Sequence, residues 1–331
     1  MTNDYRFEFR PYQRRFLRSL TTNHGKWDIR EGIILRLTDE SGKVGWGEIA
    51  PISWFGSETL EQALDFCRQL PREITDETIF SIPDELPACQ FGFESAWEMG
   101  SEFFSMPNVP CPMPQAQSFS GLLPAGEAAL NQWERLWQQG YRTFKWKIGV
   151  DAIAHELKIF ESLIHTLPAF TKLRLDANGG LSYEEANLWL WTCDNLKANP
   201  ELPLEIEFIE QPLPVEQFQQ MLELSTSYET AIALDESVAT LGQLAACYQQ
   251  GWRGIFVIKP GIVGSPSRLR KFCHQHQIDT VFSSVFETAI ARLAALQLAA
   301  ELSRNNRAIG FGIDHFFEQE ETWLQSLWND L

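Results

Sequence analysis

From about residue 112 onward, the chain repeats one pattern of apolar and polar positions. A short apolar run, often rich in β-branched residues, ends in a polar residue and is followed by a turn and an amphipathic stretch. Such runs predict buried strands, and the amphipathic stretches predict helices packed on one face. The alternation of strand and helix predicts a parallel α/β fold. The predicted strands end near Gly121, Lys147, Asp176, Glu210, Asp235, Lys259, Ser284 and Asp314.

The spacing of these strand ends narrows the fold further. Successive ends from Lys147 to Ser284 lie between 24 and 34 residues apart. Parallel neighbours need a crossover of about a dozen residues or more, which a helix supplies. The helices predicted between strands include Ala125–Gln139, Ala152–Leu167, Tyr183–Asn195 and Glu287–Arg304. Eight such units predict a (β/α)8 TIM-type barrel over residues 111–314.

Residues 1–110 follow a different pattern and predict an α+β capping domain. Arg30–Leu37 is predicted as a strand, Gly45–Glu48 as a turn-rich piece, and Glu58–Leu70 as a helix. Residues 315–331 predict a tail with one apolar helical face. That face contains Trp323, Leu324, Leu327, Trp328 and Leu331. Because such a face needs a partner, we expect the tail to pack on the capping domain, so that both chain ends close the mouth of the barrel.

Composition and charge exclude several classes of protein. Lys and Arg total 27 against 44 Asp and Glu, and the net charge of −17 repels nucleic acids and anionic lipids. The longest nearly apolar stretch, Ala289–Ala300, is shorter than the ~20 residues of a membrane-spanning helix. The start has no apolar signal segment, and the six cysteines form no Cys-x-x-Cys pair. We therefore expect a cytoplasmic protein without a nucleic-acid partner, membrane insertion or an obligate protein partner.

Three successive predicted strands end in carboxylates, at Asp176, Glu210 and Asp235. The carboxyl ends of barrel strands converge on one site. Three carboxylates in a water-poor cavity repel one another unless a cation lies between them. A set of oxygen ligands favours a hard ion, so the pattern predicts Mg²⁺, with Mn²⁺ as a substitute. The alternative that one or more of the three are only helix N-caps or loop acids stays open.

Lysines flank this set of carboxylates. Lys145 and Lys147 are two residues apart, so both ammonium groups lie on one face of their strand. Lys259 ends a run that is too apolar for a solvent-facing strand. By register, Lys147 and Lys259 come from opposite sides of the barrel, so a substrate at the metal meets an amine on each face. A single lysine is more often a surface residue, but three at strand ends beside a carboxylate set are not explained in that way.

Together these motifs resemble the enolase superfamily, specifically its muconate-lactonizing-enzyme subgroup. The motifs are Lys-x-Lys at 145–147, Asp176-Ala177-Asn178, Ile209-Glu210-Gln211-Pro212, Asp235-Glu236-Ser237 and Lys259-Pro260. The resemblance covers nearly the whole chain and implies a capped barrel whose three carboxylates hold Mg²⁺. It implies that Lys147 is the base that removes a proton α to the carboxylate of a small-molecule substrate. Lys145 would support this base, and Lys259 would stabilise the resulting enediolate from the opposite face.

The resemblance also suggests supporting residues. Asn178 and Glu236 resemble residues that orient metal ligands or lysines in relatives. Arg174 shares the strand face of Asp176, and either faces the site or forms an ion pair in the core. Ser283, Ser284 and the loop beginning at Gly261 offer hydroxyl and N–H groups for a substrate carboxylate, with ordinary loop and cap roles as the alternative. Two segments match the positions of lid loops, 21–26 and 53–57.

Within the subgroup, the short capping region and two stretches, 259–266 and 282–287, look most like the o-succinylbenzoate synthase family of menaquinone and phylloquinone biosynthesis. That resemblance implies a hydro-lyase reaction through an enediolate. It is the syn elimination of water from 2-succinyl-6-hydroxy-2,4-cyclohexadiene-1-carboxylate to give 2-succinylbenzoate. Val285 departs from the pattern, because it stands where a third serine is expected.

Other activities of the subgroup stay open. N-acylamino acid racemases and dipeptide epimerases use the same two lysines for 1,1-proton transfer, so the catalytic residues do not separate these reactions. A dipeptide epimerase usually ends its last strand in an Asp-x-Asp pair, whereas this chain offers one acid, Asp314. A muconate cycloisomerase and a non-catalytic barrel that has kept the fold are the remaining alternatives.

Overall fold

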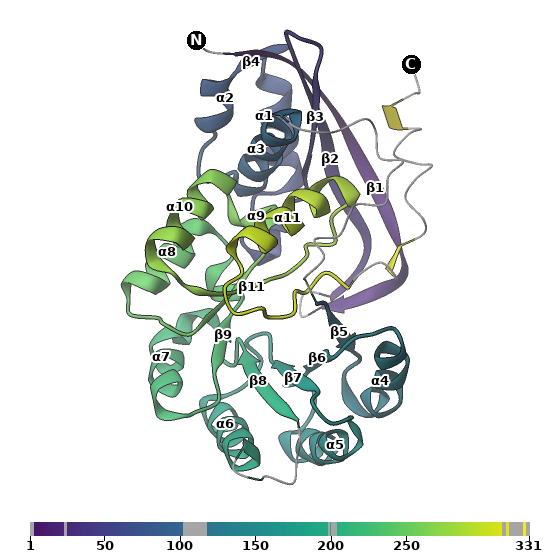
Figure 1. The fold of residues 1–331 in the computed structure, drawn as a ribbon, viewed down its shortest axis with the longest axis vertical. Coiled ribbons are helices and arrows are strands. Elements are labelled where there is room, and N and C mark those ends of the chain that lie inside the picture. Colours follow the sequence, from purple (N-terminus) through teal and green to yellow (C-terminus); the bar gives the residue numbers. More distant parts are fainter. Residues whose placement is uncertain are drawn as a thin grey trace.

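The chain forms an antiparallel sheet with helices and a ring of parallel strands surrounded by helices (Figure 1). The structure is a computed structural model and describes residues 3–22, 25–101, 118–197, 199, 204–312, 316–317 and 327–328. The N-terminal body and the barrel have separate apolar cores. Ile33 and Phe93 belong to the core of the N-terminal body, whereas Trp146 and Trp189 belong to the core of the barrel.

The N-terminal sheet has four strands in the order β3-β2-β1-β4 among the residues described. A long hairpin of β1 (Asp4–Thr22) and β2 (Gly25–Asp39) is flanked by β3 (Val44–Ile49) and β4 (Glu73–Thr75). Helices α1 (Leu60–Gln69), α2 (Asp76–Phe80) and α3 (Pro87–Ser101) complete this body. The strand predicted over Arg30–Leu37 lies within β2, and the helix predicted over Glu58–Leu70 is α1.

The prediction of a turn at Gly45–Glu48 is wrong, because this segment forms most of β3. Gly47 in this strand allows helix α3 to pack closely against it. A Cβ atom on Gly47 would lie 2.0 Å from the carbonyl oxygen of Gly92 in α3. Glycine is therefore required where the backbone of a helix crosses a strand at contact distance.

The parallel strands of the barrel follow one another in chain order from β5 to β11. They are β5 (Ser120–Leu123), β6 (Thr143–Lys147), β7 (Lys172–Asp176), β8 (Glu205–Glu210), β9 (Ile232–Leu234), β10 (Ile255–Ile258) and β11 (Asp279–Phe282). Two single bridges close the ring, from Ile309 to Phe119 and from Gly310 to Ser283. The predicted eight-stranded barrel is confirmed, with its eighth strand reduced to two bridged residues. Asp314, the predicted end of that strand, lies outside the described residues.

Helices cover the outside of this ring (Figure 1). The long ones are α4 (Ala129–Gln138), α5 (Ile153–Thr166), α6 (Tyr183–Lys197), α7 (Phe218–Ser227), α8 (Leu241–Gln249), α10 (Pro266–His276) and α11 (Ala289–Leu302). Four of them confirm the helices predicted from the sequence, with small differences at the ends. In the part of the chain that the structure describes, no helix has the length and apolarity needed to cross a bilayer.

Buried polar contacts fix the N-terminal sheet to the barrel. Glu48 in β3 accepts hydrogen bonds from the N–H groups of Thr288 (2.9 Å) and Ala291 (3.3 Å), at the start of α11. Arg30 in β2 donates to the carbonyl oxygen of Val285 (3.0 Å) beyond β11. Glu48 and Arg30 are at most 2% exposed. Because the first N–H groups of a helix have no partner within it, Glu48 satisfies donors that burial would otherwise leave unpaired.

The structure describes four residues of the predicted tail, at 316–317 and 327–328. The ring of Trp328 packs edge-on against Trp46 in β3, with 4.8 Å between ring centres. The guanidinium groups of Arg10 and Arg36 lie 5.0 and 5.1 Å from the centre of the Trp328 ring. Trp323, Leu324 and Leu331 lie outside the described residues, so the extent of the tail stays a prediction.

Candidate active site

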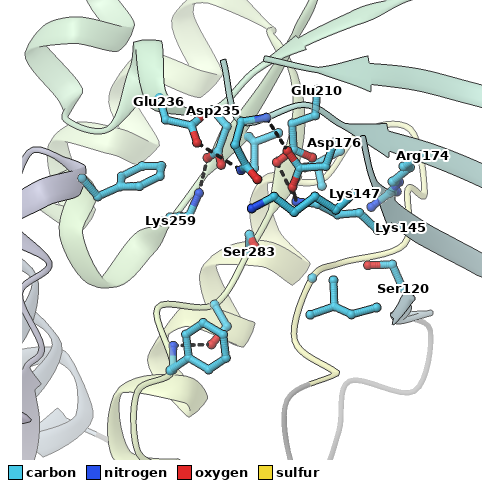
Figure 2. A pocket seen from close by; sticks show the side chains of 18 of the residues that line it. Ser120, Lys145, Lys147, Arg174, Asp176, Glu210, Asp235, Glu236, Lys259 and Ser283 are labelled. Carbon is cyan, nitrogen blue, oxygen red and sulfur yellow. Dashed lines mark hydrogen bonds and ion pairs between the residues drawn. The ribbon is translucent and has the colours of Figure 1, made fainter. Parts of the chain in front are cut away.

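A cavity of about 380 Å³ lies between the N-terminal sheet and the carboxyl ends of the barrel strands (Figure 2). Eleven of the twelve predicted site residues line it. The exception is Gly261. The polar lining comes from the barrel, whereas Leu20, Trp27, Ile52, Trp54 and Phe55 come from the N-terminal body.

The three predicted metal ligands end adjacent strands. Asp176 and Glu210 are register partners at the ends of β7 and β8, and Asp235 directly follows β9. All three are at most 7% exposed. The ammonium of Lys145 lies between two of them, 2.8 Å from Asp176 Oδ2 and 2.6 Å from Glu210 Oε1. Parallel pairing therefore places these charges together, because side chains at equivalent register positions project to one face.

The electrostatics of this cluster show how strongly it attracts positive charge. Burial, and then the negative charge of Asp176, raises the pKa of Glu210. Burial likewise raises the pKa of Asp235, against the opposing charge of Lys259. Burial opposes the charged form of Lys145, but Asp176 and Glu210 overcome it and raise its pKa. Carboxylates that repel one another in this way are stabilised by a cation among them.

The two predicted catalytic lysines reach the same space. Lys147 is the last residue of β6, and Lys259 directly follows β10. Figure 2 shows the two side chains pointing into the cavity from opposite sides of the view. Lys259 also forms an ion pair with Asp235, and its Nζ atom lies 3.9 Å from the centre of the Phe55 ring.

Arg174 combines the two roles that the sequence left open. Its Nε atom donates to Glu207 Oε2 at 2.6 Å, and both side chains are almost fully buried. Arg174 also lines the cavity, and its Nη2 atom makes no hydrogen bond to the residues that the structure describes. One end of this guanidinium is therefore anchored by Glu207 in the core, and its Nη2 atom is buried without a hydrogen-bond partner among the described residues.

Three amide and carboxyl side chains hold the strand ends together. Asn178 donates through Nδ2 to Glu236 Oε1 (3.2 Å), and its N–H donates to Asp176 Oδ1 (3.1 Å). No role was predicted for Gln211, although it belongs to the Glu-Gln-Pro motif at 210–212. This residue is fully buried, and its Oε1 accepts the N–H of Asp235 at 3.0 Å. Gln211 thus links the ends of two ligand-bearing strands.

The serine loop after β11 differs in its contacts. Ser283 and Ser284 both line the cavity. The hydroxyl of Ser284 donates to Glu287 Oε2 (2.8 Å) and accepts the N–H of Phe286 (2.9 Å), so it also stabilises its own loop. Val285 is buried with the core of the N-terminal body. A Cβ atom on Gly261 would lie 2.7 Å from Val285 Cγ2, so the absence of a side chain at Gly261 makes room for Val285.

Sequence reasoning missed the aromatic wall of the cavity. Trp27 packs edge-on against Trp54 (4.9 Å between ring centres) and Phe286 (5.5 Å). These rings come from β2, from the 3-10 helix η1 (Ser53–Phe55) and from the loop after β11. One feature of the sequence could have indicated this wall. The predicted lid at 53–57 contains two aromatic residues, Trp54 and Phe55, between serine and glycine residues, and aromatic rings in a lid can cover a site.

Comparisons with known proteins agree with this architecture. The family described as "Enolase C-terminal domain-like" matches residues 128–326, and the one described as "MenC, N-terminal domain" matches residues 11–99. The o-succinylbenzoate synthase of Thermosynechococcus vestitus is 42% identical over 94% of this chain and 93% of its own length.

Two solved structures show the same fold. One is the o-succinylbenzoate synthase from Thermosynechococcus elongatus, complexed with Mg in the active site. It has a TM-score of 0.87 and 40% identity, and the match covers 98% of this chain and 100% of that one. The other is the L-Ala-D/L-Glu epimerase from Bacillus subtilis, with a TM-score of 0.72 at 21% identity, over 95% of this chain and 91% of that one. The chain therefore belongs to the o-succinylbenzoate synthase family, whose barrels are of the enolase C-terminal domain-like kind.

Proposed function

We propose that the protein is an o-succinylbenzoate synthase, a Mg²⁺-dependent hydro-lyase that converts 2-succinyl-6-hydroxy-2,4-cyclohexadiene-1-carboxylate to 2-succinylbenzoate. One observation carries the proposal. Two lysines enter one cavity from opposite sides, next to three buried carboxylates at the ends of adjacent strands. The 42% identity to a synthase of this name supports the choice of substrate within the family.

The proposed metal ligands are Asp176, Glu210 and Asp235. Their oxygen-only donor set suits Mg²⁺, and their mutual repulsion favours a divalent ion. Among the described residues, no three His, Cys, Asp or Glu side chains are already gathered at metal-binding distances. The ammonium of Lys145 instead balances Asp176 and Glu210, and a metal would take over that balance. When bound, Mg²⁺ supplies positive charge next to the substrate carboxylate.

Lys147 is the proposed base. In its neutral form, the amine takes the proton from the ring carbon that bears the carboxylate, and the bonding electrons form an enediolate. The hydroxyl then leaves from the same face, because the elimination is syn. The ammonium formed on Lys147 lies on that face, so it returns the proton and the hydroxyl departs as water. The ring becomes aromatic, with no net change in the protonation of the enzyme.

Lys259 is proposed to act without transferring a proton. Its ammonium approaches from the opposite side, where it stabilises the negative charge of the enediolate. The aromatic wall formed by Trp27, Trp54 and Phe286 lowers the local polarity and strengthens this attraction. An apolar cavity of about 380 Å³ with a few convergent charges suits a small organic anion.

An ultraviolet assay tests the function. The purified protein is mixed with the cyclohexadiene substrate and Mg²⁺, and the loss of diene absorbance is followed. Turnover that disappears in Lys147→Ala and after chelation of the metal supports the proposal. No turnover by protein with bound metal contradicts it, and proton exchange on N-acylamino acids is then the activity to test.

The partners and the cellular location of the enzyme are part of the same proposal. A small-molecule carboxylate is the proposed partner, and no obligate protein partner is required for the reaction described above. A place in the cytoplasm is proposed from the sequence and is tested by fractionation of cells that express the chain.

A further inference from the structure

We propose that Phe55 is a positioning residue for Lys259: the face of its ring holds the ammonium over the cavity, where it meets the reacting substrate. This inference rests on the proposed dehydration, because it assigns Phe55 a part in that reaction. Phe55 belongs to η1 of the N-terminal body, whereas Lys259 belongs to the barrel. The contact therefore joins the two bodies at the catalytic lysine.

The geometry is that of a cation over an aromatic face. The Nζ atom of Lys259 lies 3.9 Å from the centre of the Phe55 ring. The Lys259 side chain is only 13% exposed, so little water competes for its charge. The quadrupole of a ring attracts an ammonium at this distance, and desolvation strengthens the attraction.

The ring differs from the other partner of Lys259 in one important respect. Asp235 forms an ion pair with this lysine and is also a proposed metal ligand, so a bound metal shares its charge. The Phe55 ring is unaffected by that competition. A ring face also attracts the ammonium without taking up its N–H groups in strong hydrogen bonds, so they stay available to the enediolate.

The surroundings hold Phe55 in place. Gly56 adopts a φ of 120°, which glycine tolerates, and a Cβ atom there would lie 3.1 Å from Ala239 Cβ. The N–H of Ile52 donates to Ser57 Oγ at 2.7 Å, across the turn that carries the ring. Ala239 directly follows the 3-10 helix η4 (Glu236–Val238), which begins next to Asp235. The segment 235–239, which begins with the partner of Lys259, therefore also packs against the turn that carries Phe55.

Nuclear magnetic resonance tests the contact without any reaction. The Mg²⁺-saturated protein is labelled with ¹³C at the lysine Cε atoms, and the Lys259 signal is assigned from Lys259→Arg. Ring current should shift this signal upfield of the signals of exposed lysines. Phe55→Leu should abolish the shift, and Phe55→Tyr should keep it. Trp54→Leu is the matched control, because it removes a neighbouring ring that packs on Trp27, and it should also keep the shift.

Turnover tests the catalytic consequence. We expect Phe55→Leu to lower kcat about tenfold, with KM nearly unchanged, and Phe55→Tyr to restore it. An unshifted Lys259 signal in the wild type, or a Phe55→Leu variant that raises only KM, overturns the inference. Thermal unfolding of Phe55→Leu checks that the variant is folded. If the wild type does not turn over the cyclohexadiene, the proposed function fails, while the lysine signal still decides whether Phe55 positions Lys259.

Discussion

Most of the charged side chains that line the cavity form ion pairs with groups of opposite sign, although the lysines and carboxylates come from different strands. Lys145 pairs with Asp176 and Glu210, and Lys259 pairs with Asp235. Such burial is costly unless charges are matched. Removal of one member therefore leaves its partner uncompensated, and the effects of substitutions here combine loss of chemistry with loss of charge balance.

Lys147→Ala should lower kcat by about 10³-fold, because positioned proton transfer contributes rate factors of about 10²–10⁴. The rate of diene loss under saturating substrate is the measurement. Lys158→Ala provides the control, since this lysine lies exposed on the outer helix α5. Equal losses in the two variants would mean that Lys147 is not the base.

Glu207→Gln should lower the free energy of unfolding at pH 7 by about 3 kcal/mol, because it leaves Arg174 buried without its counter-charge. Burial raises the pKa of Glu207, but Arg174 and Arg307 outweigh it and lower the pKa below its usual value. A lowered carboxyl pKa stabilises the fold above the unfolded value of 4.5, and this contribution is lost as pH falls through the folded pKa.

Urea unfolding at several pH values measures this effect. The difference between wild type and Glu207→Gln should shrink as the pH falls below about 4.5. Glu205→Gln, on the same strand but 55% exposed beside Lys172, should cost less than about 1 kcal/mol. A pH-independent difference for Glu207→Gln would show that its ion pairs do not carry the effect.

At the level of residues, the sequence predicted the barrel half of the site better than the capping half. Strand-end positions converge by geometry alone, so Asp176, Glu210 and Lys259 could be identified from local pattern. Phe55 and Trp27 reach the cavity only because the hairpin and η1 are laid over the barrel. No short-range pattern encodes that placement, and the contact of Gly261 with Val285 was likewise invisible for this reason.

Among the elements, β3 shows how a glycine can be misread. Gly45 and Gly47 predicted a turn, yet the segment is a strand paired with β2. Gly47 is needed there because the backbone of α3 leaves no room for a side chain. Most barrel strands were predictable because they are short, largely apolar runs with a polar residue at or just beyond the end, as in β7, β8 and β10. The eighth is two bridged residues at 309–310, too short for a periodic signal to define its end.

Gly47→Ala should destabilise the protein by about 3 kcal/mol or more, since overpacking against backbone at 2.0 Å forces the helix and strand apart. Gly242→Ala is the matched control. It lies in α8, its added Cβ would be 3.9 Å from the nearest atom, and alanine favours a helix, so stability should rise by up to about 1 kcal/mol. Urea titrations followed by circular dichroism measure the free energy of unfolding of both variants. An unchanged free energy of unfolding in Gly47→Ala would disprove the close-packing explanation.

For the whole molecule, the proposed metal links the site to global stability. A ligand that binds only the folded state stabilises it by mass action, by about 2.7 kcal/mol at a concentration 100 times its Kd. Asp176, Glu210 and Asp235 lie at the ends of three different strands, so an ion bound by all three would connect these strands.

Mg²⁺ should therefore raise the Tm of the wild type, and a chelator should reverse the rise. Asp235→Asn should abolish most of this dependence, because it removes one proposed ligand and its charge. The exposed Asp65→Asn in α1 should respond to Mg²⁺ as the wild type does. Calorimetric scans with and without the metal measure the effect, and an unchanged response in Asp235→Asn would argue against its role as a ligand.

The contact of Trp328 with Trp46 also bears on how the protein is made. Trp46 in β3 meets Trp328 on the N-terminal sheet, and the whole barrel lies between these two residues in sequence. During synthesis, the hairpin and β3 emerge from the ribosome before the barrel, but the surface around Trp46 lacks its contact with Trp328 until residue 328 has emerged. A nascent chain that has emerged past the closing bridges at Ile309 and Gly310, but not yet to residue 328, therefore carries an exposed aromatic patch of the kind that chaperones recognise.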